Sequence, residues 1–222
     1  MAKLYEILIK KINSWLNGDS PREESKIFNP IGSKIGNNIL IDSLDYRGLN
    51  FFVKEIREHT VILSSKKYRF VDYILAACSL KGDDVLVKLR LLPQNASYKA
   101  VVLHLYDEFG YNDDFKAVVN DKSKKFNVDD DEINLHEEYW RINDVGISLE
   151  SRYLSLVDEN NDGKVNANEL ISGKMEFWDY SRLTTIDSVE IEQFLFVEMN
   201  KEDGWFQIWR GTEVPSEKIE VL

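Results

Sequence analysis

The sequence of 222 residues contains one cysteine, Cys78, and no long apolar run. A single cysteine excludes a disulfide within the chain and favours a reducing compartment. A membrane-spanning helix needs roughly eighteen consecutive apolar residues, so none is expected. Glu6, Lys10 and Lys11 interrupt the apolar opening of the chain, which argues against a secretory signal. Together these absences predict a cytoplasmic protein.

The usual catalytic signatures are also missing. The three histidines, His59, His104 and His136, lie far apart and form no metal-ligand spacing. The sequence has no zinc-protease helix motif, nucleophile elbow, phosphate-binding loop or dinucleotide fingerprint. Basic residues occur only in short runs such as Lys66-Lys67, which excludes the electrostatic footprint of a nucleic-acid-binding protein. An enzyme is therefore the less favoured class.

Charge is distributed unevenly along the chain, whose formal net charge is −11. Residues 1–111 carry 16 basic and 13 acidic side chains, a balance of +3, and residues 112–222 carry 28 − 16 = 12 basic and 39 − 13 = 26 acidic ones, a balance of −14. With 43% hydrophobic residues the chain can bury a sizeable core. The contrast in charge predicts two units.

Apolar residues at helical spacing predict an amphipathic helix over residues 1–18, followed by a polar linker over 19–26. The apolar stripe consists of Leu4, Ile7, Leu8, Ile12, Trp15 and Leu16. Docking on the body or on a partner chain is the favoured role of this helix. Peripheral membrane contact through residues 2–16 and self-association remain open.

Alternating and β-branched segments separated by turn residues predict a β-rich unit over residues 27–106 and a second one over 139–222. An acidic connection over 107–138, with room for a short helix, joins them. The expected fold class is α+β and mostly β, with two small antiparallel units that are sheet or barrel-like. VEIEQFLFVEMN (189–200) becomes apolar at both alternate positions, which indicates a strand covered on both faces.

One motif is specific. DENNDGKVNANE, residues 158–169, has the spacing of an EF-hand calcium loop, with a glycine at the sharp turn. The expected ligands of one Ca²⁺ ion are Asp158, Asn160, Asp162, the Lys164 carbonyl, Asn166 and Glu169. The upstream flank fits either an entering helix or a strand, and the downstream flank leaves room only for a short helix. The alternative is a polar Asx-rich turn.

A second loop of this kind is not apparent. NVDDDEINLHEE, residues 127–138, comes nearest to the pattern, but Glu132 stands where the glycine belongs. An acidic surface loop is the better interpretation of that segment. The calcium loop is therefore expected to be a lone site of moderate affinity.

Several segments together resemble the YjfK-like family of uncharacterised bacterial proteins. They are KIGNNILIDSLDYRGLNFFVKEI, KYRFVDYIL, VKLRLLP, EFWDYSR and FLFVEMNKEDGWFQIWRG, and the similarity covers most of residues 27–221. The resemblance implies a bacterial cytoplasmic protein encoded beside phage-shock and other membrane-stress genes. It implies no activity and supplies no catalytic residues.

The sequence thus favours a non-enzymatic calcium-binding protein that acts as an interaction or adaptor protein through an unknown protein partner. The alternative is a carboxylate-based hydrolase or small-ligand enzyme with its site in the C-terminal β-rich unit, where acidic residues abound.

Overall fold

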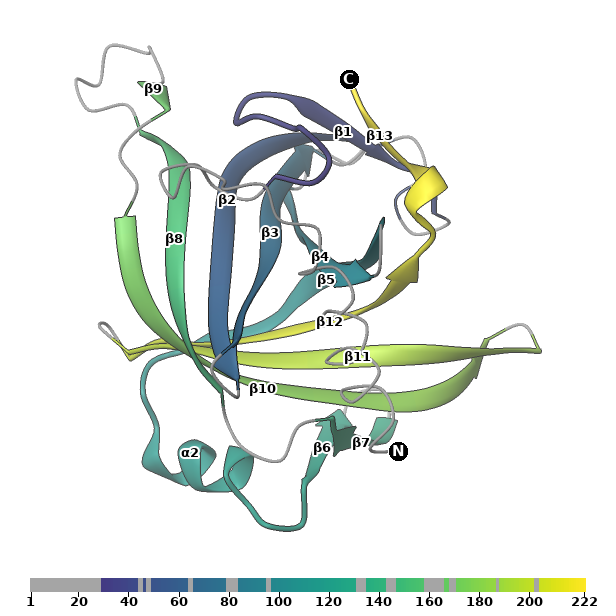
Figure 1. Ribbon diagram of the computed structural model, residues 1–222. Coiled ribbons are helices and arrows are strands. Elements are labelled where there is room, and N and C mark those ends of the chain that lie inside the picture. The colour runs from purple at the N-terminus through teal and green to yellow at the C-terminus, as the bar shows by residue number, and fades with distance from the viewer. Residues whose placement is uncertain are drawn as a thin grey trace.

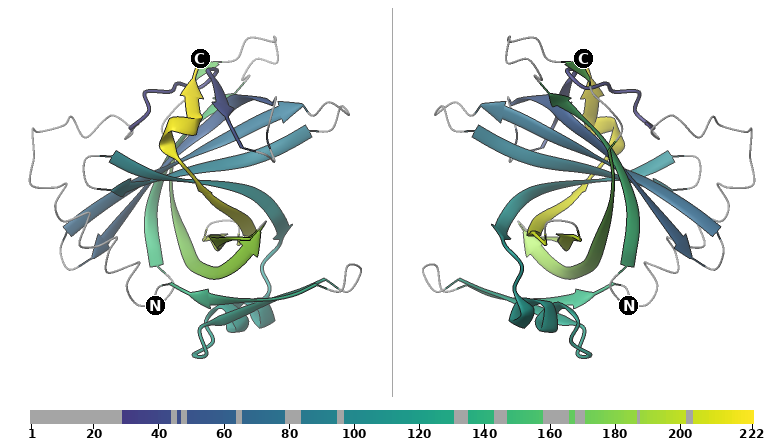
Figure 2. Two further views of the ribbon diagram at one scale, coloured as in Figure 1. Left: turned by 90° about the vertical axis from the view of Figure 1, so that its right-hand side faces the viewer. Right: turned by 90° about the vertical axis from the view of Figure 1, so that its left-hand side faces the viewer.

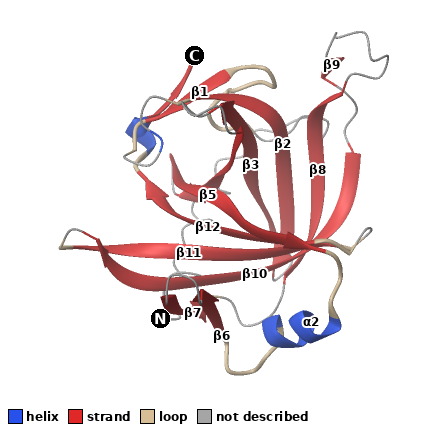
Figure 3. Cartoon of the chain, turned by 180° about the vertical axis from the view of Figure 1, so that it is seen from behind, coloured by secondary structure: helices blue, strands red, loops and turns tan. Residues whose placement is uncertain are grey.

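The computed structural model describes residues 29–43, 46, 49–63, 66–78, 84–94, 97–130, 135–142, 147–157, 166–167, 171–186, 188–201 and 204–222. Strands dominate this part of the chain (Figure 3). The expectation of a mostly β, antiparallel fold is therefore confirmed. The amphipathic helix predicted over residues 1–18 lies outside the described residues.

The N-terminal half of the chain forms strands that become longer after the first one. They are β1 (Asn38–Ile41), β2 (Asn50–Leu63), β3 (Lys66–Cys78), β4 (Asp84–Gln94) and β5 (Ser97–Phe109). The short helix α2 (Asp113–Val119) follows, with the Asn112 side chain accepting a hydrogen bond from the Phe115 N–H as its N-cap. The acidic connection thus includes one short helix.

The C-terminal half adds further strands and one 3₁₀ turn. They are β6 (Lys125–Asp130), β7 (Leu135–Arg141), β8 (Ile147–Val157), β9 (Asn166–Ala167), β10 (Ile171–Ile186), β11 (Val189–Asn200), β12 (Phe206–Val214), η2 (Ser216–Lys218) and β13 (Ile219–Val221).

The sheet closes on itself. Antiparallel pairing runs from β2 through β3, β4, β5, β12, β11 and β10 to β8, and β8 pairs back onto β2. These eight strands form a closed, barrel-like ring, and closure removes most of the exposed sheet edges. Strand β8 is the seam, because Arg57 of β2 pairs with Tyr153 of β8, which also pairs with Ile171 of β10.

The two predicted β-rich units are therefore parts of one sheet. Strands β2 to β5 come from the first unit and β8, β10, β11 and β12 from the second. The charge difference between the halves of the chain does not mark a break in strand pairing. Each half contributes one side of the ring, with β5 paired to β12 and β2 paired to β8.

Additional elements cover the outside of the ring at two places. Figure 2 shows β1 and β13 at one end of the molecule and α2, β6 and β7 at the other. The first group encloses an apolar cluster that includes Phe51, Tyr73 and Leu89, and the second encloses one that includes Trp178, Val197 and Phe206. Strand alternation supplies both clusters, since every second residue points to the same face.

Strands β12 and β5 approach each other closely at Gly211. A Cβ atom at this position would lie 1.8 Å from the Val102 carbonyl oxygen, so only glycine fits. Elsewhere, no helix within the described ranges is long and apolar enough to cross a membrane.

Candidate functional site

The predicted calcium loop connects β8 to β10. Its residues 158–165 and 168–169, and with them Asp158, Asn160, Asp162, Lys164 and Glu169, lie outside the described residues. Asn166 belongs to the short strand β9, whose backbone pairs with the end of β8 through Val157↔Asn166 and Leu156↔Ala167. Both flanks are therefore strands, which resolves the open choice at the upstream flank in favour of a strand. The loop emerges from a hairpin rather than from two helices.

The inner face of the ring carries a cluster of charged side chains that we call the interior ion cluster. Its members are His59 of β2, Asp72 of β3, Lys88 and Arg90 of β4, and Glu198 of β11. All five side chains are buried. Strand alternation explains their position, because Val71, Tyr73, Val87 and Leu89 point to the opposite face, into the apolar cluster under β1.

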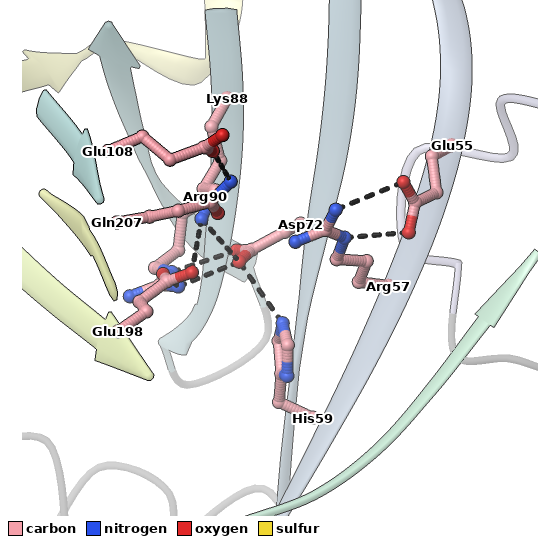
Figure 4. Close-up of polar contacts among 9 residues, drawn as sticks. All are labelled: Glu55, Arg57, His59, Asp72, Lys88, Arg90, Glu108, Glu198 and Gln207. Carbon is pink, nitrogen blue, oxygen red and sulfur yellow. Dashed lines mark hydrogen bonds and ion pairs between the residues drawn. The ribbon is translucent and has the colours of Figure 1, made fainter. Parts of the chain in front are cut away.

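The ion pairs of the cluster cross the ring (Figure 4). Lys88 Nζ donates to Glu198 Oε2 at 2.6 Å, and Arg90 Nη2 donates to Glu198 Oε1 at 2.6 Å. Because β4 and β11 are separated in the ring by β5 and β12, these contacts tie one wall to the opposite wall. Bridging two strands that are not neighbours is a role that hydrogen bonds of the sheet cannot fulfil.

Asp72 occupies the centre of the cluster. It accepts hydrogen bonds from Arg90 Nε at 2.8 Å and Arg90 Nη2 at 2.7 Å, in the planar two-point arrangement typical of arginine and carboxylate. His59 Nε2 lies 3.1 Å from Asp72 Oδ2. Since an ionised carboxylate can only accept, a neutral His59 must carry its proton on Nε2.

The electrostatics of the cluster balance. Burial alone would raise the pKa of Asp72, but the charge of Arg90 outweighs it and holds that pKa well below its usual range. Burial would likewise raise the pKa of Glu198, and Lys88 and Arg90 lower it. Burial lowers the pKa of His59, which keeps its ring neutral. Two cations thus face two anions.

Of the two cations in the interior ion cluster, Lys88 has the pKa nearer to neutral pH. Burial lowers its pKa to about 8, although Glu198 and Asp72 act in the opposite direction. Its ammonium group also lies 4.0 Å from the centroid of the Trp209 ring. Arg90 is enclosed by aromatic rings, with its Cζ atom 4.9 Å from the centroid of Phe70 and 4.7 Å from that of Phe196. Aromatic faces therefore replace much of the lost hydration of both cations.

A second polar group lies outside the ring, between β7 and β10 to β12. Glu137 accepts hydrogen bonds from Arg182 and from Arg210, the latter at 2.9 Å. Gln193 Oε1 accepts from Arg182 Nε at 2.7 Å and from the Tyr139 hydroxyl at 2.8 Å. Because the acceptor oxygens of Glu137 and Gln193 are occupied in this way, the group links β7 to β10, β11 and β12.

The carboxylates near α2 are also neutralised. Burial would raise the pKa of Glu176, but hydrogen bonds from Lys116 and Lys201 lower it. Cations thus surround both carboxylates, with Lys116 and Lys201 on Glu176 and Arg182 and Arg210 on Glu137.

Comparison of the chain with protein-family models, with curated proteins and with solved structures finds no match. The resemblance to the YjfK-like family therefore stays a prediction. Among the described residues, no group of three or more histidine, cysteine, aspartate or glutamate side chains is arranged to hold a metal ion.

Sequence reasoning missed the interior ion cluster, although a signal was present. VLVKLRLL (85–92) places Lys88 and Arg90 at alternate positions of an otherwise apolar strand, and YRFVDYIL places Asp72 likewise. Charged residues on one face of strands whose other face is apolar indicate either a solvated face or a buried network. Distinguishing the two requires knowing that β8 closes the ring over that face.

Proposed function

We propose that the protein is a non-enzymatic calcium-binding protein that acts through a protein partner. The observation that carries the proposal is the complete calcium-loop spacing of residues 158–169, in which every position of the pattern is filled. The expected ligands are those named above: Asp158, Asn160, Asp162, the Lys164 carbonyl, Asn166 and Glu169.

The backbone around the loop supports this proposal. The pairing Val157↔Asn166 brings the residue before the first loop position beside the ninth loop position. Paired Cα atoms of antiparallel strands lie about 4.5 to 5.5 Å apart. The backbone before the first loop position is thus held beside the ninth position, which lowers the entropy cost of gathering the ligand oxygens.

The position of the loop suggests what the ion does. Strand β8 closes the ring, and the loop joins its end to β10, the strand beside it. An ion bound there would fasten β8 to β10 and oppose opening of the seam. Binding to the native state alone stabilises it by RT ln(1 + [Ca²⁺]/Kd), about 2.7 kcal/mol at a hundredfold excess over Kd.

The direct test is thermal unfolding of the chain at increasing calcium concentrations. Tm should rise with calcium, and Glu169→Gln, which removes the charge of the ligand that closes the shell, should abolish most of the rise. Glu138→Gln is the matched control, because Glu138 ends the similar segment 127–138 that lacks the glycine. Its calcium-dependent rise should equal that of the wild type.

Magnesium provides a second control. The smaller ion demands near-octahedral geometry and releases its waters reluctantly, so the same concentration of Mg²⁺ should give a much smaller rise. Equal rises with both ions, or a rise in Glu169→Gln as large as in the wild type, would show nonspecific ionic stabilisation. If millimolar calcium gives neither heat of binding in calorimetry nor a rise in Tm, the loop is a polar turn that does not bind calcium.

The partner function rests on exposed aromatic residues, which are frequent in binding surfaces. Trp140 and Trp205 are 38% and 47% exposed, whereas Trp178 and Trp209 are buried. Capture of proteins on the immobilised chain, compared between calcium and a chelator and between wild type and Trp205→Ala, tests it. A partner retained equally by the wild type and Trp205→Ala would contradict this surface.

A further inference from the structure

Strands β10 and β11 extend beyond the ring as a two-stranded hairpin arm, residues 182–186 and 188–192. The last residue of β10 that pairs with β7 is Ser181, and the first residue of β11 that pairs with β12 is Gln193. Beyond these points β10 and β11 pair only with each other within the described residues. Figure 1 shows the arm projecting to the right of the body, and Figure 3 shows it from behind.

The arm exposes apolar side chains as well as backbone. Leu183 is 65% exposed and Val189 is 60% exposed, the largest values among the exposed large hydrophobic residues of the described chain. An isolated two-stranded hairpin is marginally stable in water, and its unpaired N–H and C=O groups accept a further strand. The arm is therefore a candidate for strand addition.

The two edges of the arm differ in charge. The β11 edge carries Glu190 and Glu192, and antiparallel pairing of this edge with a copy of itself would bring these carboxylates together. The β10 edge carries Leu183, Thr184 and Thr185, which are uncharged. Glu192 lies near a cation, with its Oε2 3.8 Å from Lys99 Nζ, so Glu190 is the main charge opposing self-pairing of the β11 edge. The uncharged β10 edge is therefore the more compatible with a second copy of itself.

The one charge at the base of the β10 edge is already neutralised. Arg182 donates to Glu137 and, through Nε, to Gln193 at 2.7 Å. Its guanidinium group is thus held against β7 and β11 and does not oppose an approaching strand. Threonine pairs across antiparallel strands are favourable, which suits this edge to self-pairing.

The terminal edges of the sheet show the protection that the β10 edge lacks. Strand β13 is only three residues long, Ile219–Val221. Strand β6 is six residues long and begins with the charged Lys125. Short length and charge are the usual means by which proteins prevent pairing at an edge. Among the described residues, the β10 edge of the arm has neither protection, which makes it a candidate for pairing.

We propose that the β10 edge of the arm, Arg182–Ile186, pairs antiparallel with the same edge of a second copy of this chain. A twofold axis at Thr184 places Thr184 opposite its counterpart and Leu183 beside the partner's Thr185. The two arms then form one four-stranded sheet that covers the exposed Leu183 side chains. The short edge makes this a concentration-dependent dimer.

Sedimentation of the full chain from low to hundreds of micromolar protein tests the proposal. The wild type should show a monomer–dimer equilibrium, and Leu183→Lys should weaken association at least about tenfold, because the proposed register places the two new charges at diagonal positions on the same face and removes the apolar side chains that the pairing covers. Val189→Lys is the control, since it adds the same charge to a similarly exposed residue on the opposite edge of the arm. Its association should match that of the wild type.

A disulfide trap checks the pairing directly. In a Cys78→Ser background, Thr184→Cys should form a linked dimer under mild oxidation, because opposite Cα atoms about 4.5 to 5.5 Å apart are within disulfide range. Glu190→Cys, on the other edge, should link far more slowly. A wild type that stays monomeric throughout, equal association of Leu183→Lys and wild type, or equal linking at both cysteines would each overturn the proposal.

Discussion

Replacing Asp72 by asparagine measures how strongly the interior ion cluster stabilises the ring. The substitution preserves the size of the side chain and removes its charge. In the wild type, Asp72 accepts two hydrogen bonds from Arg90, at 2.8 and 2.7 Å, and lies 3.1 Å from His59 Nε2. In the variant, Lys88 and Arg90 share Glu198 alone, so two buried cations face one anion.

The expected cost follows from that imbalance. Removing one partner of a buried ion pair typically destabilises a protein by about 3 to 5 kcal/mol, because the remaining charge stays buried without compensation. The Asp72 side chain and both cations are almost completely buried, so water cannot screen the loss. Total stabilities of domains are about 5 to 15 kcal/mol, so the variant should lose a large share of its stability.

Urea unfolding followed by tryptophan fluorescence gives the free energy of unfolding, and an unchanged m-value ensures that the comparison is valid. Glu138→Gln is the matched control. Glu138 also pairs with a cation, Lys125, at 3.0 Å, but their side chains are 37% and 38% exposed. It should therefore cost only about 1 kcal/mol. If Asp72→Asn costs no more than Glu138→Gln, the cluster does not stabilise the ring as argued.

Two further results are expected. Burial lowers the pKa of Lys88 from 10.5 to about 8, so between these pH values the unfolded chain binds more protons than the native one. The free energy of unfolding of the wild type should therefore rise with pH across this window. This contribution should be absent in Lys88→Met. Gly211→Ala should cost about 3 kcal/mol or more in urea unfolding because its Cβ would collide with the Val102 carbonyl, whereas Gly110→Ala, which has open space around it, should cost far less. A flat pH difference between Lys88→Met and wild type, or equal costs at the two glycines, would refute the respective argument.

The strands themselves were largely predictable from the sequence. KYRFVDYILAAC lies within β3 (Lys66–Cys78), and VEIEQFLFVEMN coincides with β11 (Val189–Asn200). Residues Phe194 to Met199 are all buried, which confirms that β11 is covered on both faces. Period-2 alternation reports local burial, and local burial decides where a strand forms.

Other boundaries depended on tertiary structure. Strand β2 is continuous from Asn50 to Leu63, with an irregular register against β3 between Val53 and Glu55. A bulge inserts one residue and reverses the alternation of faces, so one alternation pattern does not describe the whole strand. The segment ISLESRYLSLV fitted helix and strand equally until β2 and β10 were known to flank it.

Ring closure and the ion cluster could not be predicted, because both are non-local. The bonds from Lys88 and Arg90 to Glu198 join residues 110 and 108 positions apart. Nothing in the local spacing of these residues encodes that distance. The charge difference between the halves of the chain suggested separation, whereas the paired cations come from the first half and Glu198 from the second. Opposite charges here join the halves.

The charges inside the ring compensate one another. Lys88, Arg90, Asp72 and Glu198 satisfy one another, so the cluster offers no excess charge to a ligand. We therefore place recognition outside the ring, at the predicted calcium loop and at the hairpin arm. Strand β10 connects these two sites. The predicted calcium loop, residues 158–169, ends shortly before β10 begins at Ile171, and the arm is the other end of the same strand. Between them, Phe177, Trp178 and Tyr180 are buried, and β10 is paired with β11 throughout Met175–Ile186. Because burial and pairing fix the middle of β10, we expect the proposed calcium binding at one end of the strand and the proposed pairing of the arms at the other end to be independent of each other.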